Sequence, residues 1–203
     1  MAKIVLDKYY TPSNIAIELI EQTLNFIGRD NIDTIIEPSA GNGAFSNYLF
    51  DTYSHKYKIL AFDIQPEEDR IIEQDFLKLN LQYNDKCLII ENPPFGVCNV
   101  DILHFFNKSI TLGKYIAFIL PISQLNNTNS IYKYNLTYSK CLGILNYSDR
   151  NLHCCFNVYE QPQSGILNKK ISNKIEGIDI IYKRDGKQWD NVKTCDLCMI
   201  RWV

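Results

Sequence analysis

The chain has 203 residues, of which 46% are hydrophobic and 22% are charged, and its formal net charge is -2 at pH 7. This length is enough for one domain with a substantial core. A mean hydropathy of -0.18 and the lack of a run of 18 apolar residues argue against a membrane-spanning helix, and the first residues lack the apolar segment of a signal peptide. We therefore expect a globular cytoplasmic protein with no membrane partner. The slightly acidic balance also argues against a strong non-specific grip on a nucleic-acid duplex, although residues 165–203 carry eight Lys/Arg against five Asp/Glu.

Short apolar runs alternate along the chain with amphipathic stretches, which is typical of a mainly parallel sheet covered by helices. The predicted helices run from Thr11-Pro12-Ser13 to Gly28, from Gly43 to Tyr53 and from about Val100 to Leu112. The predicted strands cover residues 34–36, 58–63, 70–72, 87–90 and 115–120. Residues 124–138 predict a loop, residues 142–146 and 154–159 a hairpin, and residues 178–182 and 195–202 a second, C-terminal hairpin.

The segment NPPF, residues 92–95, follows a buried-strand pattern and therefore predicts a turn at the carboxyl end of a strand. Ligands bind at that end in open α/β sheets. Pro93 and Pro94 each fix φ and lack a backbone donor, so the turn is stiff and its carbonyls are open to a ligand. The Asn92 carboxamide beside them can accept hydrogen bonds from an exocyclic amine. We expect Phe95, on the same turn, to be exposed and to offer a flat face to a planar ring.

Seven cysteines in a cytoplasmic chain predict reduced thiols. Cys154, Cys155, Cys195 and Cys198 could form a four-thiolate zinc site. However, the first two are neighbours in a strand-like run and would face opposite sides of a sheet. We therefore predict buried thiols and no metal.

Further motifs occur in order along the chain: YYTP at 9–12, EPSAGNGAF at 37–45, AFDI at 61–64, QDFL at 74–77 and NPPFG at 92–96. In this order the chain resembles the S-adenosylmethionine-dependent N6-adenine methyltransferases with the γ order of motifs, of TaqI type. It is also similar to the small ribosomal-RNA adenine methyltransferases. The resemblance implies a Rossmann-like class I methyltransferase fold: an α/β domain with a mixed, mostly parallel sheet of seven strands flanked by helices, followed by a C-terminal β-hairpin.

The resemblance also implies roles for individual residues. Asn92 and the Pro93 carbonyl would accept both protons of the target amine, Pro94 would stiffen the turn and Phe95 would stack on the target base. The residues implied to bind S-adenosylmethionine are Tyr10, Thr11, Glu37, Pro38, Ser39, Gly41, Gly43, Asp63, Ile64, Asp75, Phe76 and Phe105.

Among these residues, Glu37 and the backbone of the next residues would hold the methionine part, whose carboxylate Thr11 would cap. The loop has no lysine and begins with a carboxylate, which suits an ammonium and a sulfonium better than a phosphate. Asp63 stands where an acid binds ribose hydroxyls in Rossmann-type sites. Asp75 would accept the adenine amino group, and apolar side chains would flank the ring.

The resulting hypothesis is methyl transfer to the N6 amino group of adenine in nucleic acid, with DNA favoured over RNA. Alternatives are a ribosomal-RNA base methyltransferase, a guanine N2 enzyme, a protein glutamine N5-methyltransferase, and an inactive nucleic-acid-binding subunit. We expect a single domain over 1–203, with a catalytic core at 1–160 and an extension at 161–203. TaqI-type enzymes carry a separate target-recognition domain that we do not find. We therefore expect little sequence specificity, a single-stranded or structured substrate, or a protein partner that supplies recognition.

Overall fold

The computed structural model describes residues 10–96, 99–147 and 151–170. Its seven strands form one sheet in the order β3-β2-β1-β4-β5-β7-β6. The strands are β1 (Thr34–Glu37), β2 (Lys58–Asp63), β3 (Ile72–Glu73), β4 (Asn84–Glu91), β5 (Gly113–Pro121), β6 (Asn135–Asn146) and β7 (Asn151–Glu160). All neighbours pair in parallel except β7, which is antiparallel to both β5 and β6. This confirms the predicted mixed, mostly parallel sheet.

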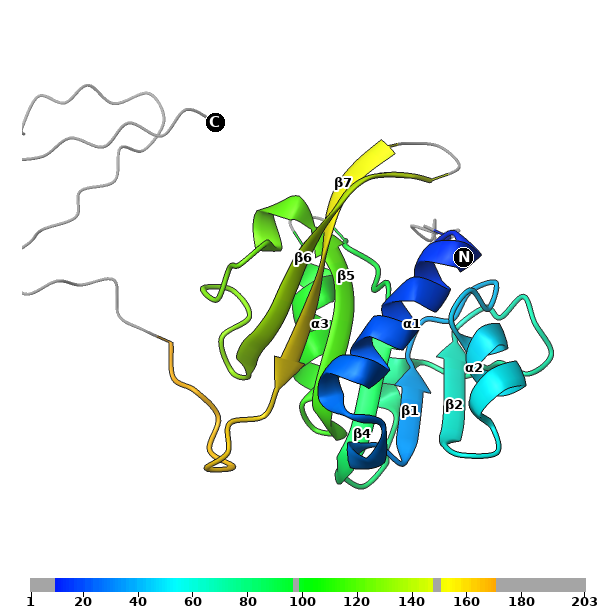
Figure 1. Ribbon diagram of the computed structural model, residues 1–203, viewed down its shortest axis with the longest axis horizontal. Coiled ribbons are helices and arrows are strands. Elements are labelled where there is room, and N and C mark those ends of the chain that lie inside the picture. Colours follow the sequence, from blue (N-terminus) through cyan, green and yellow to red (C-terminus); the bar gives the residue numbers. More distant parts are fainter. Residues whose placement is uncertain (1–9, 97–98, 148–150, 171–203) are drawn as a thin grey trace, which may run out of the picture. The chain divides into compact units, whose positions relative to one another are not determined.

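Within the described residues, three α-helices and several short 3-10 helices cover the sheet. Of these, α1 and α3 lie on opposite faces of it (Figure 1). The helices are α1 (Ser13–Ile27), α2 (Ser46–Tyr53), α3 (Val100–Ser109), η1 (Arg29–Asn31), η2 (Phe76–Lys78) and η4 (Ile122–Gln124). None of the described helices is long and apolar enough to cross a membrane.

The central strands are buried on both faces because helices cover the sheet from each side. Leu88, Ile89 and Ile90 of β4 and Ile116 to Leu120 of β5 are all at most 1% exposed. Such continuous apolar runs are characteristic of parallel strands. The core therefore holds β4 rigidly up to its carboxyl end, where the NPPF turn begins.

Several predicted boundaries were wrong, although the elements themselves were found. The second helix begins at Ser46, because residues 41–45 form turns in which Gly41 and Gly43 have φ of 53° and 79°. The third helix ends at Ser109. The third strand is Ile72–Glu73 rather than 70–72, and the predicted loop at 124–138 gives way to β6 at Asn135.

The predicted hairpin of 142–146 and 154–159 is confirmed by β6 and β7. The described residues up to Lys170 belong to one compact unit. The predicted C-terminal hairpin lies outside the described residues, as do Cys195 and Cys198.

Candidate active site

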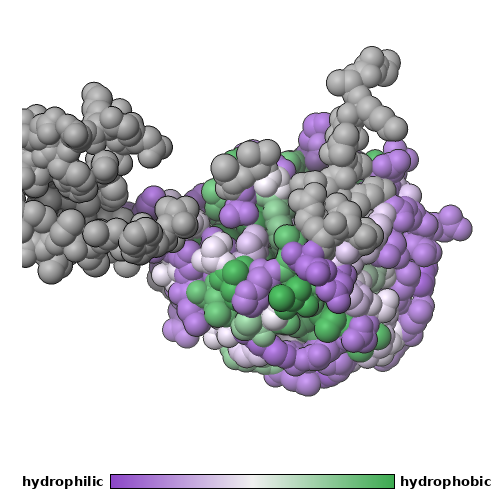
Figure 2. Space-filling view, turned by 90° about the horizontal axis from the view of Figure 1, so that it is seen from above, coloured by the Kyte–Doolittle hydropathy of each residue, from purple (hydrophilic) through white to green (hydrophobic). Residues whose placement is uncertain are grey.

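A pocket of about 130 Å³ opens at the carboxyl ends of β1, β2 and β4. Figure 2 looks down on this edge of the molecule, where apolar side chains gather near the middle and hydrophilic ones surround them. Segments far apart in the sequence line the pocket. They contribute Tyr10, Thr11, Glu37, Pro38, Ser39, Ala40, Gly41, Asn42, Ala44, Phe45, Asp63, Ile64, Asp75, Phe76, Asn92, Pro93, Pro94 and Phe105.

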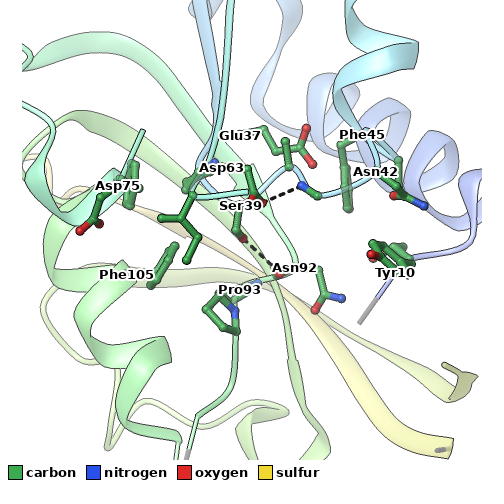
Figure 3. Close-up of a pocket in the computed structure, with 18 residues that line it drawn as sticks. Tyr10, Glu37, Ser39, Asn42, Phe45, Asp63, Asp75, Asn92, Pro93 and Phe105 are labelled. Carbon is green, nitrogen blue, oxygen red and sulfur yellow. Dashed lines mark hydrogen bonds between the residues drawn. The ribbon is translucent and has the colours of Figure 1, made fainter. Parts of the chain in front are cut away.

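The glycine loop, residues 38–45, forms one wall of the pocket and is tied to β2. The Gly41 N–H donates to Asp63 Oδ2 at 2.8 Å (Figure 3). The Gln65 N–H donates to Asp63 Oδ1 at 2.7 Å. The Ala40 N–H donates to the Phe62 carbonyl at 2.9 Å. Asp63 therefore fixes the loop while its remaining lone pairs are available to a ligand.

Gly43 shapes the loop without lining the pocket. Its φ of 79° favours glycine, and a Cβ there would come within 2.5 Å of Asn47 Nδ2. In the structure Gly43 sets the path of the backbone, and its role in binding a cofactor stays a prediction.

Two acids, Glu37 and Glu91, end β1 and β4 and are 2% and 0% exposed. Burial, with a contribution from the charge of Asp63, raises the pKa of Glu37 to about 8 against the opposing hydrogen bonds of Ser46 and Phe45. Burial and the nearby Glu37 also hold the pKa of Glu91 well above its usual range. At neutral pH both carboxyl groups therefore favour the protonated form, and of the two Glu37 lines the pocket.

The NPPF turn forms the wall that faces the glycine loop (Figure 3). The Asn92 Nδ2 donates to the Tyr147 hydroxyl at 3.4 Å, and the Ser39 hydroxyl lies 3.4 Å from the Asn92 carbonyl. With its amide nitrogen directed at Tyr147, the Asn92 carboxamide presents its oxygen on the other side. This orientation suits acceptance of a hydrogen bond from an amine.

On the remaining side, aromatic and apolar groups line the pocket. Phe76 and Phe105 stack with centroids 5.4 Å apart and an interplanar angle of 24°. Ile64 is 50% exposed beside them on the pocket wall. Asp75 Oδ1 caps η2 by accepting from the Leu77 N–H at 3.0 Å.

The sequence was compared with known proteins. No protein-family model matches it. It is 30% identical over 189 residues to ribosomal RNA small subunit methyltransferase A of Mycoplasma mobile, a match that covers 80% of this chain and 68% of the relative. The chain belongs to the ribosomal RNA small subunit methyltransferase A family.

Solved structures agree on the fold of this methyltransferase. A proposed RNA methyltransferase from Pyrococcus horikoshii superposes with a TM-score of 0.61 at 15% identity, over 79% of this chain and 90% of that one. The methyltransferase subunit of a type I restriction-modification system from Streptococcus thermophilus gives a TM-score of 0.56 at 13% identity, over 77% of this chain and 45% of that one. Both show the class I methyltransferase fold.

Most residues predicted for the methyltransferase site meet at this pocket. The exceptions are Gly43 and Phe95. Phe95 is 9% exposed and packs in the hydrophobic core, so the expectation that it is exposed on the turn was wrong. The turn directs this side chain inward, where burial of a large aromatic ring is favourable. Stacking of Phe95 on a target base stays a prediction, and it requires the ring to leave the core.

Sequence reasoning missed other residues at the site. Ala40, Asn42, Ala44 and Phe45 line the pocket and lie inside the EPSAGNGAF motif, so the motif itself was their signal. Tyr147 directly follows β6 and had no sequence signal. Cys154 and Cys155 are fully buried in β7, and no cluster of potential metal ligands occurs among the described residues.

The raised pKa of Glu37 predicts a pH-dependent stability of the methyltransferase. The folded protein holds this proton up to about pH 8, whereas the unfolded chain releases it near pH 4.5. The stability that goes with the proton is fully present below pH 4.5 and is lost as the pH rises through 8. Glu37→Gln, which cannot ionise, should therefore gain melting temperature relative to the wild type as the pH rises from 5 to 8.5. Thermal unfolding followed by circular dichroism measures this difference.

Glu18→Gln is the matched control for this experiment. Glu18 is a half-exposed acid whose pKa is lowered by Lys140, so it is ionised across this pH range. Its difference from the wild type should stay flat between pH 5 and 8.5. A flat difference for Glu37→Gln as well would contradict the assignment of a neutral Glu37.

Proposed function

We propose that this protein transfers a methyl group from S-adenosylmethionine to the N6 amino group of adenine in ribosomal RNA. The observation that carries the proposal is that the NPPF turn lines the same pocket as the glycine loop and three acids. The turn would present its acceptors to that pocket. Membership of a family named for ribosomal RNA favours RNA over DNA. This reverses the preference for DNA drawn from the motifs alone.

The pocket fits S-adenosylmethionine by its charge. Glu37, Asp63 and Asp75 line it, and no Lys or Arg is among its described lining residues. A ligand with an ammonium and a sulfonium satisfies such a wall, whereas a phosphate would be repelled. When bound, S-adenosylmethionine supplies a methyl group activated by a positive sulfur.

The chain's own residues then have separable tasks. Glu37 would ionise to hold the ammonium, and Asp63 would accept from the ribose hydroxyls. Asp75 would accept from the adenine amino group, while Ile64 and Phe105 pack on the ring. These tasks orient the cofactor and exclude water from it.

At the opposite wall, Asn92 Oδ1 and the Pro93 carbonyl would accept the two hydrogens of the target amine. Those bonds direct the nitrogen lone pair into the pocket and stabilise the positive charge that develops on nitrogen. Because both prolines lack N–H groups, neither of them can compete for these oxygens as a backbone donor.

A transfer assay tests the proposed function. The purified protein is incubated with methyl-labelled S-adenosylmethionine and, separately, with small-subunit ribosomal RNA, DNA or a protein pool, and the products are digested to nucleosides or amino acids. We expect label in N6-methylated adenosine from RNA. Label confined to DNA would overturn the choice of RNA, label confined to glutamine would support a protein N5-methyltransferase, and label in guanosine would overturn adenine as the target.

Tyr147→Phe tests how the target amine is positioned. Loss of the hydroxyl removes one acceptor of Asn92 Nδ2, so the carboxamide is held less firmly in the orientation that faces the amine. One positioning hydrogen bond is worth about 0.5–1.5 kcal/mol, which corresponds to a fall in kcat of roughly 3–10-fold. The affinity for S-adenosylmethionine should stay unchanged in calorimetry.

Tyr134→Phe is the matched control. Tyr134 is also buried, but its hydroxyl donates to the Gly113 carbonyl at 2.9 Å and takes no part in the pocket. We expect some loss of stability and an unchanged kcat. An equal fall in kcat for both variants would refute a specific role for Tyr147.

A further inference from the structure

Glu91 is a fully buried acid that the proposed reaction does not use. It is the last residue of β4, directly before Asn92, and it is 0% exposed. Its strand lies between β1 and β5, and in the parallel register Glu91 is opposite Phe118, which is also fully buried. An acid in such a place is costly unless it is neutral or well bonded.

The contacts of Glu91 reach both walls of the pocket. Its Oε2 lies 2.8 Å from the Ser39 hydroxyl of the glycine loop. Ser39 Oγ lies in turn 3.4 Å from the carbonyl oxygen of Asn92 (Figure 3). Ser39 therefore links the glycine loop to the NPPF turn, and Glu91 contacts the Ser39 hydroxyl that makes this link.

The protonation state of Glu91 decides which hydrogen bonds the Ser39 hydroxyl can make. A serine hydroxyl has one proton, so it can donate either to a Glu91 carboxylate or to the Asn92 carbonyl. A neutral Glu91 instead donates its own proton to Ser39 Oγ and leaves the serine proton for Asn92. Glu91 Oε1 is buried and has no hydrogen-bond partner among the described residues, an arrangement that costs much less for a neutral acid than for a carboxylate.

We propose that Glu91 is a positioning residue that, through Ser39, fixes the backbone of the amine-binding turn against the glycine loop. The inference rests on the proposed function, because the position of the turn matters only if Asn92 and Pro93 receive the target amine. The donor chain runs from Glu91 to Ser39 to the Asn92 carbonyl. It holds a backbone segment that, through its two prolines, has few donors of its own.

Two substitutions separate the hydrogen bond from the space that Glu91 fills. Glu91→Gln keeps the shape, is neutral and retains a donor, so kcat should stay within about threefold of the wild type. Glu91→Met fills a similar volume without a donor, so kcat should fall at least tenfold. For both variants we expect S-adenosylmethionine affinity by calorimetry within about threefold of the wild type, and for Glu91→Met a melting temperature no lower than that of the wild type, since it removes a buried acid.

A double mutant tests whether Glu91 acts through Ser39. If it does, Glu91→Met combined with Ser39→Ala should lower kcat no further than the more severe single change. Full additivity of the two effects would overturn this link. So would a Glu91→Met variant with unchanged kcat, or a Glu91→Gln variant as slow as Glu91→Met.

Ser39→Ala alone covers the case in which Glu91→Met fails to fold. It leaves Glu91 in place and removes only the hydroxyl, so a kcat at the wild-type level would overturn the proposal. All rates are measured on whichever pool the wild type labels. If the RNA assignment is wrong, the wild type will label DNA or protein instead of RNA. If the Glu91 inference is wrong, the kcat of the variants relative to the wild type will differ from the values expected above.

Discussion

Replacing Asn92 by alanine should lower kcat for methyl transfer by about 10²–10³-fold, because the loss of one pre-organised electrostatic group at the reacting centre has that size. The side chain sits on the wall of the pocket with its nitrogen directed at Tyr147, so alanine removes the acceptor without opening the core. The affinity for S-adenosylmethionine should remain within about threefold of the wild type. Single-turnover rates and calorimetry measure the two quantities separately.

Asn107→Ala is a control of the same chemistry outside the site. Asn107 is exposed on α3, where its side chain accepts from Lys133 at 2.6 Å, and it does not line the pocket. Its removal should leave kcat and cofactor affinity unchanged. Full turnover by Asn92→Ala would mean that the target amine is held elsewhere.

Replacing Asp63 by alanine should have the opposite signature and weaken S-adenosylmethionine binding by about 10–100-fold. The carboxylate accepts from the Gly41 N–H and the Gln65 N–H, and hydrogen bonds to charged groups are worth about 1.5–3 kcal/mol each. Alanine loosens the glycine loop and removes the acid expected to meet the ribose. Titration calorimetry measures the loss directly.

Asp51→Ala controls for the loss of a surface carboxylate. Asp51 forms an exposed ion pair with Arg70 at 2.6 Å and does not line the pocket. Exposed pairs contribute little, so cofactor affinity should not change. An Asp63→Ala variant that binds the cofactor as tightly as the wild type would contradict the placement of the site.

Local patterns predicted the parts of the molecule that depend on local causes. Residues 58–63 were predicted as a strand with the bounds that β2 has, because a short apolar run between amphipathic stretches is typical of a buried strand. The NPPF turn was placed at the end of β4 because it follows a buried-strand pattern, and its two prolines fix φ and lack backbone donors. The pocket follows from these, since the carboxyl ends of neighbouring parallel strands share one edge of a sheet.

Contacts between distant segments could not be predicted from one sequence. Ser39 meets Glu91 across 52 residues and Asn92 meets Tyr147 across 55, and neither pair has a periodic or spacing signal. The burial of Phe95 could not be predicted for the same reason. Its position after two prolines favours exposure, but the core formed by the rest of the chain takes up the ring.

The two edge strands of the sheet are short or irregular, unlike its central strands, and this affects self-association. At one border, β3 is only two residues long. At the other, β6 departs from regular pairing with β7 between Leu136 and Tyr138 and again between Cys141 and Gly143. Short and bulged edges offer a poor template for a strand from another molecule. Neither edge strand of this open sheet is therefore a good site for adding a strand from a second molecule, which disfavours fibril formation.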